Sequence, residues 1–288
     1  MEFVHSRKRE SPVKSFWRKF RKQKLALISG FFILALFVIA IFGPEIAPYS
    51  AAKPDYNNIL SGPSWQHLAG TDAYGRDIFS RIIIGTRISL SVSIGSVILG
   101  ALGGTILGLI SGFYGKWLDS LIMRASDVLF AFPGMLLAIG IIAILGPGLN
   151  NVVIAIAIFS VPSFARIVRS STLDAKSTIY VEATRSIGAK NRRIIWKHIF
   201  PSTLSSIIVY FTMRIGNAIL VAASLSFLGL GAQPPTPEWG AMLSSGRNYI
   251  SNEPHVTFFP GLAIFITVLA FNLLGDGLRD TLDPKVKD

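Results

Sequence analysis

Six apolar stretches constrain the fold of this chain more than any other feature of its sequence. A helix needs about 20 apolar residues to cross the hydrocarbon core of a bilayer, and all but the fourth stretch approach that length. Lipid favours helices, because a helix bonds its own backbone N–H and C=O groups. The stretches comprise residues 25–43, 88–112, 128–146, 152–164, 204–230 and 258–274. The sequence therefore predicts an all-α, polytopic membrane protein with six transmembrane helices.

The composition agrees with a membrane protein and excludes several other classes. Hydrophobic residues make up 51% of the 288 residues and charged residues only 15%, which is too apolar for an ordinary soluble domain. A net charge of +12 would suggest a nucleic-acid partner in a soluble protein, but here the basic residues are concentrated in particular loops. We therefore expect no nucleic acid. The absence of cysteine excludes disulfides, thiolate metal sites and cysteine nucleophiles.

The distribution of Lys and Arg predicts the orientation of the helices. With the N-terminus inside, the inside segments hold 22 of the 28 Lys and Arg residues and the outside segments hold five. Cytoplasmic loops are rich in these residues, so we expect both termini in the cytoplasm. The expected order is a basic amphipathic cytoplasmic tail at 1–24, a first transmembrane helix at 25–43, an extracytoplasmic loop at 44–87, a five-helix core at 88–274 that includes a cytoplasmic loop at 165–203, and a cytoplasmic tail at 275–288.

The second stretch carries a ridge of glycines that repeats every four residues. Glycine at this period lets a neighbouring helix approach backbone to backbone, which stabilises helix packing in lipid. The sequence therefore predicts that this helix is central and buried against another helix. The ridge comprises Gly100, Gly104, Gly108 and Gly112.

Residues 180–201 form a charged segment between two apolar stretches and predict two short amphipathic helices joined at a glycine. Val181 and Thr184 are three residues apart, which is the spacing of one helical face. Gly188 interrupts the first helix, and the second is expected to stop at Pro201, since proline lacks the N–H that a helix interior needs. An ordinary amphipathic helix at the membrane surface is the competing interpretation.

The same segment resembles the glutamate-alanine-alanine loop of bacterial ABC importer permeases. The resemblance rests on Glu182-Ala183-Thr184, followed by Gly188 and then Pro201. Thr184 stands where a second alanine is usual. In the family this loop docks into a groove on an ATPase subunit. The resemblance implies that Glu182 offers a charged contact to that groove and that Gly188 permits the turn and a close approach.

Three further blocks extend the resemblance over most of the chain. They resemble the second permease subunit of the dipeptide, oligopeptide, nickel and glutathione ABC importers. Residues 224–242, with the ending through Asp283, are most similar to the glutathione and small-peptide branch. The blocks are residues 70–80, 226–240 and 271–284, and the resemblance covers the chain from about Phe16 to Pro284.

This resemblance implies the type I ABC importer permease fold in a bacterial cytoplasmic (inner) membrane. In the family, six helices from each of two homologous permeases enclose a central path. The partners implied for this chain are a homologous second permease, two ATPase subunits, an extracytoplasmic substrate-binding protein, the lipid bilayer and a peptide substrate. The chain would be a transport subunit and not an enzyme, because Mg-ATP binds to the partner ATPases.

One strong charge, Arg214, lies inside an apolar stretch, with Asn217 three residues later on the same helical face. An arginine at the centre of a bilayer costs roughly 2.5 to 3.5 kcal/mol on insertion scales unless it faces protein or water. No carboxylate of this chain lies at a similar depth, so its partner is expected to be backbone, water, substrate or a second subunit. We hypothesise that Arg214 and Asn217 line the translocation path near a peptide carboxylate; a structural pair with the neighbouring permease is the alternative.

Motifs for other chemistry are missing from the sequence. There is no Gly-x-x-x-x-Gly-Lys-Ser/Thr loop for nucleotide phosphates and no His-Glu-x-x-His, and all four histidines lie outside the predicted spans. We therefore expect no catalytic residues, no metal and no cofactor in this chain. Two alternative functions remain: a nickel-chelate importer permease of the same family, and a stand-alone secondary carrier, which would need ion-coupling groups in mid-span.

Overall fold

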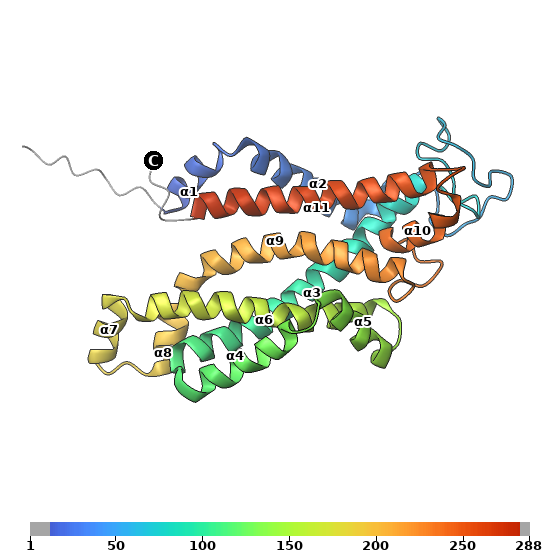
Figure 1. Cartoon of the computed structure of the whole chain (residues 1–288). Coiled ribbons are helices and arrows are strands. Elements are labelled where there is room, and N and C mark those ends of the chain that lie inside the picture. The colour runs from blue at the N-terminus through green and yellow to red at the C-terminus, as the bar shows by residue number, and fades with distance from the viewer. Residues whose placement is uncertain (1–11, 283–288) are drawn as a thin grey trace, which may run out of the picture.

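The computed structural model describes residues 12–282, which form a bundle of long helices (Figure 1). Five stretches of helix are long and apolar enough to cross a membrane. They are α2 (Lys24–Ile46), α3 (Ile78–Tyr114), α6 (Leu149–Lys176), α9 (Phe200–Phe227) with the helical turns before it, and α11 (His255–Leu282). Within the described residues the β pairing amounts to one isolated bridge, between Thr71 and Asp77. The prediction of an all-α membrane fold is confirmed.

A sixth span exists only as a bent pair of helices. The prediction of one helix over 128–146 is wrong in this respect: α4 (Lys116–Phe130) and α5 (Gly134–Leu145) meet at a bend of 89°. The break falls at Pro133, which is the N-cap of α5. A proline disfavours helical geometry in the residue before it and donates no backbone hydrogen bond, so one helix ends there and another begins.

The shorter elements gather at the two ends of the bundle (Figure 1). One end carries α1 (Pro12–Phe20), α7 (Ile179–Ser186), α8 (Asn191–Ile194) and the C-terminal end of α11. The other end carries the loop of residues 47–77, α10 (Trp239–Gly246) and the 3-10 turn η2 (Arg247–Tyr249). The segments on which the sequence resemblance rests therefore lie at opposite ends of the molecule.

The glycine ridge of α3 packs directly against α6. Cβ atoms added to Gly100, Gly108 and Gly112 would each lie 2.7 Å from a side-chain Cβ atom of α6, and one on Gly104 would meet Phe164. The four facing side chains repeat every four residues as well: they are Ser160, Phe164, Val168 and Thr172. Rows of period four interlock in helix packing, and the glycines bring the two backbones into contact. Among the described residues, these two helices form the most extensive helix pair of the bundle.

Two predicted boundaries differ from the structure. The loop expected at 44–87 is shorter, because α3 begins at Ile78, where the Asp77 carboxylate caps the helix by accepting a hydrogen bond from Ser80 N at 2.7 Å. The tail expected at 275–288 is helical as far as Leu282, the end of α11. Residues 1–11 and 283–288 of the two predicted tails lie outside the described residues.

The predicted helix stop at Pro201 is also wrong. The chain is helical from Asn191 through Phe227, and Pro201 occupies the first turn of α9. A π-helical turn, η1 (Ile195–Ile199), precedes it. The π turn shifts the hydrogen-bond pattern just before Pro201, and proline is accommodated where this pattern changes to that of α9.

Candidate functional site

The short helix α7 has one buried face and one exposed face. Val181 is 1% exposed and packs with Ile194 and Ile199 into a small core beneath the helix. Ile187, the residue after α7, is 84% exposed, and Glu182 is exposed as well. Ile179, the first residue of α7, is 85% exposed as well, so large apolar side chains are exposed at both ends of this helix. The segment from Tyr180 to the start of α9 is therefore packed against the protein on one face and exposed on the other.

The turn after α7 depends on Gly188. Its backbone φ angle is +82°, which residues other than glycine adopt rarely. A Cβ atom there would meet no atom within 4 Å. The constraint on Gly188 is thus conformational rather than steric. The turn is tied back at its base, where Tyr180 Oη donates a hydrogen bond to the carbonyl of His198 at 3.3 Å.

The structure separates the five residues of the predicted loop motif into two groups. Glu182 and Ala183 are exposed on α7, and Gly188 is exposed just after it. Thr184 is half-buried and donates its hydroxyl to the carbonyl of Tyr180 at 2.7 Å, a bond that an alanine at this position would lack. Pro201 is exposed but belongs to α9, after the turn.

Arg214 contacts the neighbouring helix of its own chain. Its Nε and Nη2 atoms donate to Ser160 Oγ of α6 at 3.3 and 3.2 Å, and Nη1 donates to Asn217 Oδ1 at 3.2 Å. The guanidinium lies 4.5 Å from the centroid of the Phe159 ring. The expected partners were backbone, water, substrate or another subunit, so these neighbours are a correction. The sequence alone does not show that Ser160 and Phe159 reach Arg214, because they lie 54 or more residues away and meet it only through packing.

The contacts of Arg214 leave its charge without an opposite charge. Ser160 and Asn217 are neutral acceptors, and no ion pair of Arg214 occurs among residues 12–282. Asn217 is itself exposed. The pair predicted from sequence therefore lies together at the surface of α9, with one positive charge available to a partner.

An ion pair near the α7 end was missed in the sequence. Arg169 of α6 binds Asp119 of α4 through two hydrogen bonds, from Nε at 2.5 Å and from Nη2 at 2.6 Å. The Ser111 hydroxyl of α3 donates to the same carboxylate at 2.5 Å. Three helices thus meet at one carboxylate. The available signal in the sequence is a charged residue, Asp119, in the short polar stretch between two apolar runs. Its partner, however, lies 50 residues away.

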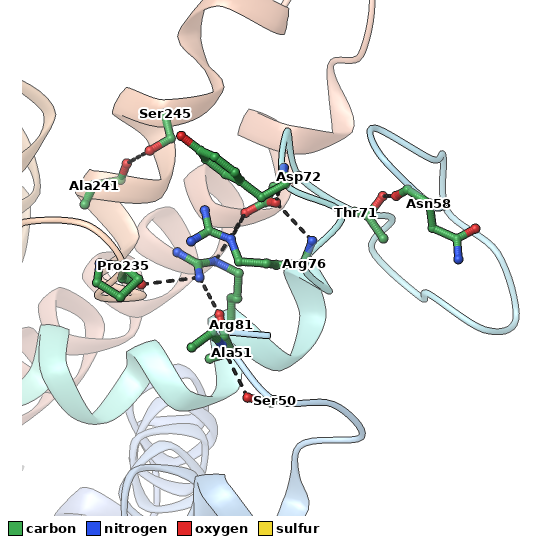
Figure 2. A network of polar contacts seen from close by, with 12 residues as sticks. Ser50, Ala51, Asn58, Thr71, Asp72, Arg76, Arg81, Pro235, Ala241 and Ser245 are labelled. Carbon is green, nitrogen blue, oxygen red and sulfur yellow. Dashed lines mark hydrogen bonds and ion pairs between the residues drawn. The ribbon is translucent and has the colours of Figure 1, made fainter. Parts of the chain in front are cut away.

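A denser polar network occupies the opposite end of the bundle (Figure 2). Asp72 Oδ2 accepts from Arg76 Nε at 2.7 Å and lies 3.6 Å from Arg81 Nε. His67 Nδ1 lies 2.9 Å from the Asp77 carboxylate, which also caps α3. All five side chains are buried. The sequence shows neither the burial of this group nor the part played by Arg81.

The residues before and at the start of α10 close this end of the molecule. Glu238 is 2% exposed and caps α10, accepting a hydrogen bond from Ala241 N at 2.9 Å. Burial raises the pKa of the Glu238 carboxyl group above its ordinary value, and backbone hydrogen bonds from Gly240 and Ala241 offset part of the effect. Trp239 is 1% exposed, and its Nε1 donates to the carbonyl of Ile82 on α3 at 3.1 Å.

The bundle of apolar helices, with short exposed helices at one end and a closed polar cap at the other, defines a polytopic integral membrane protein. Its sequence matches the family described as "Binding-protein-dependent transport system inner membrane component" over residues 104–288. The N-terminal part, residues 11–63, matches the "N-terminal TM domain of oligopeptide transport permease C". The chain belongs to the family of binding-protein-dependent transport system inner membrane components, and it is an ABC importer permease of the inner membrane.

Relatives with assigned names match almost the whole chain. The "Glutathione transport system permease protein GsiD" of Pectobacterium atrosepticum is 56% identical over 278 residues, which is 96% of this chain and 92% of the relative. The proteins of the same name from Escherichia coli O6:K15:H31 and Shigella boydii serotype 4 are each 57% identical over the same shares.

Solved structures agree on the fold at much lower identity. A chain of the MetNI methionine ABC transporter in an inward-facing conformation matches with a TM-score of 0.59 and 20% identity, covering 71% of this chain and 97% of that chain. An amino acid ABC transporter crystallised with histidines matches with a TM-score of 0.55 and 19% identity, covering 69% and 92%. The expected ABC importer permease fold is confirmed.

Proposed function

We propose that this chain is the permease subunit of an importer for glutathione or similarly small peptides and forms half of the translocation path. The observation that carries the substrate class is the identity of 56–57% to permeases named for glutathione transport, over 96% of the chain. This favours glutathione-like peptides over a nickel chelate. Membership of a binding-protein-dependent family argues against a stand-alone carrier.

The partners and the orientation follow from the same proposal. The family as a whole works with a second permease, ATPases and a substrate-binding protein; for this chain we infer one homologous permease, two ATPases that bind Mg-ATP, and a binding protein outside. The excess of Lys and Arg in the segments proposed to lie inside supports a cytoplasmic position for α7 and for both termini. The loop of residues 47–77 and α10 then face outward, where a binding protein can dock.

Coupling to ATP is assigned to the exposed face of the segment from Tyr180 to Pro201. Closing of the ATPases would move α7, which is anchored through Val181 to the ends of α3 and α6. A rigid anchor transmits the movement to the spans, which rock between inward-facing and outward-facing arrangements. The binding energy of ATP shifts this equilibrium, and this chain supplies no covalent chemistry.

Uptake by the reconstituted transporter tests the proposed substrate. The chain is co-purified with its permease and ATPase partners, placed in vesicles, and supplied with binding protein and labelled glutathione. ATP-dependent uptake that unlabelled glutathione and small peptides compete away is the expected result. Uptake of a nickel chelate that glutathione does not compete away would replace this proposal with the nickel alternative.

The conformation of Gly188 provides a prediction for coupling. Gly188→Val is expected to lower ATP-driven uptake at least tenfold, because a β-branched residue is strongly disfavoured at a φ of +82°. Gly188→Asn is the matched control, since asparagine tolerates this region and the space around the position is open. Uptake and ATP hydrolysis are measured together. Equal uptake by the two variants would show that the turn at Gly188 does not couple uptake to ATP hydrolysis.

The charge of Arg214 provides a prediction for the path. If Arg214 meets a peptide carboxylate, Arg214→Gln raises the KM for uptake about tenfold or more, because a hydrogen bond to a charged group contributes about 1.5–3 kcal/mol. Ser160→Ala removes a protein partner of Arg214 but not its charge, and is expected to leave KM within about twofold. An unchanged KM and rate in Arg214→Gln, with normal folding, would remove this residue from the path.

A further inference from the structure

A cavity of about 630 Å³ lies between the end of the 47–77 loop, the start of α3 and the region of α10. One wall carries the charged residues of the polar network, and the other carries neutral polar side chains. The residues that matter for its chemistry are Asp72, Arg76, Arg81, Gln233, Ser245 and Asn248. The volume is large enough for a small peptide.

The charged wall of the cavity has one positive charge in excess. The side chains of Arg76 and Arg81 are 8% and 5% exposed, and both use the same carboxylate, that of Asp72. The neighbouring Asp77 is paired with His67 and caps α3, and it does not line the cavity. Two guanidinium groups therefore share one carboxylate in a poorly hydrated place. A buried charge of this kind is costly unless an opposite charge accompanies it.

The two arginines differ in how their donors are used. Arg81 Nη1 donates to the carbonyl of Ala51 at 2.5 Å and lies 3.4 Å from the carbonyl of Pro235, so it fixes the loop to the segment before α10 (Figure 2). Arg76 donates to Asp72 through Nε, but within residues 12–282 its two terminal nitrogens have no hydrogen-bond acceptor. Its guanidinium is held 4.7 Å from the centroid of the Tyr74 ring. Arg76 is thus held in one orientation, and its two terminal nitrogens, with four N–H groups, remain for a ligand.

We propose that this cavity binds a carboxylate group, with the terminal nitrogens of Arg76 as its donors. Guanidinium donors in a fork fit a planar carboxylate. The single excess positive charge matches one carboxylate better than a dianion such as phosphate. Gln233, Ser245 and Asn248 offer neutral hydrogen-bonding groups for the rest of the ligand. The carboxylate can come from a free small peptide, which rests on the proposed function, or from an acidic side chain of the docked binding protein.

A carboxylate added to the opposite wall tests the site without disturbing the arginines. Ser245 is exposed and lines the same cavity as Arg76 (Figure 2), and its hydroxyl donates to the carbonyl of Ala241. In Ser245→Asp the new carboxylate competes for the excess charge, whereas Ser245→Asn has nearly the same shape and no charge. Both variants are made in the full complex of permeases and ATPases in lipid nanodiscs.

Two binding measurements distinguish the sources of the carboxylate. Calorimetry without binding protein uses glycylglycine and glycylglycine amide as probes. If a free peptide supplies the group, Ser245→Asp weakens glycylglycine binding at least tenfold relative to Ser245→Asn, and the amide binds poorly to both. If the binding protein supplies it, its affinity for the complex shows this tenfold difference instead.

The proposal is overturned if Ser245→Asp and Ser245→Asn behave alike in both measurements. This result is independent of the transported substrate, since neither measurement requires import of glutathione. A complex that fails to import glutathione but shows the tenfold difference would refute the proposed function and keep the carboxylate site. A complex that imports glutathione but shows no difference between Ser245→Asp and Ser245→Asn would keep the proposed function and refute the carboxylate site.

Discussion

Gly104→Ala is expected to destabilise the protein, although alanine forms helices better than glycine. A Cβ atom at this position would lie 2.6 Å from the carbonyl oxygen of Val161 and 2.9 Å from the N of Ala165, and it would collide with Phe164. Two of these three atoms belong to the backbone of α6 and cannot rotate away. Forcing extra atoms into a packed interface costs about 1–3 kcal/mol. The thermal unfolding midpoint of the purified protein should fall by several degrees.

Gly95→Ala is the matched control for this prediction. Gly95 lies on the same helix, α3, and a Cβ atom there would meet no atom within 4 Å. The substitution is expected to leave the unfolding midpoint unchanged or to raise it slightly, since alanine is about 1 kcal/mol more favourable than glycine inside a helix. Opposite signs for the same chemical change would identify the contact with α6 as the cause. Equal midpoints for the two variants would contradict the packing argument.

The glycine ridge shows how far the sequence predicts this fold. Period four in the second apolar stretch indicated a buried helix with a close neighbour, but it did not identify that neighbour. A second row of period four, at Ser160, Phe164, Val168 and Thr172, faces the glycines in the structure. This row is visible in the sequence, yet many apolar segments contain such a row by chance. The pairing of α3 with α6 depends on packing among all helices, which single-segment periodicity does not contain.

The errors at Pro201 and over 128–146 have one physical origin. Proline disturbs a helix in either case, but the effect depends on which backbone N–H groups already lack partners. At Pro133 the chain bends by 89° between α4 and α5. At Pro201 the preceding π turn allows the helix to continue. A sequence shows where proline stands, but it does not show whether the next turn can adjust its hydrogen bonds.

The residues of the candidate sites also fall into two groups, those that the sequence identified and those that only the structure revealed. Arg214 and Asn217 were identifiable because a charge inside an apolar stretch is rare, whereas Ser160 and Phe159 became partners only through packing. Arg81 was hidden for another reason: ten residues at the start of α3 were assigned to a loop, so its burial was not expected. Residues whose importance comes from composition were found, and residues whose importance comes from contacts at long range were missed.

Ile187→Asp is expected to abolish ATP-driven uptake without unfolding the chain. The side chain is 84% exposed and contributes almost nothing to this protein's own core, so the unfolding midpoint of the isolated chain should not change. In a docked complex the same side chain would be buried, and a carboxylate without a partner is costly there. Central interface residues contribute about 2 kcal/mol or more, which corresponds to a loss of roughly thirtyfold in ATPase affinity. Co-purification of the ATPases and uptake are the measurements.

Two further variants separate docking from folding. Ile187→Met keeps the apolar character and volume of the residue, and it should retain both the ATPases and uptake. Val181→Asp places the same charge on the buried face of α7, where the side chain is 1% exposed, and is expected to lower the unfolding midpoint of the chain itself. If Ile187→Asp also lowered that midpoint, or kept its ATPases and full uptake, the exposed face of α7 would not be the docking surface. If only Ile187→Asp loses the ATPases, and its unfolding midpoint is unchanged, the contact lies on the exposed face of α7 and not on the buried face that carries Val181.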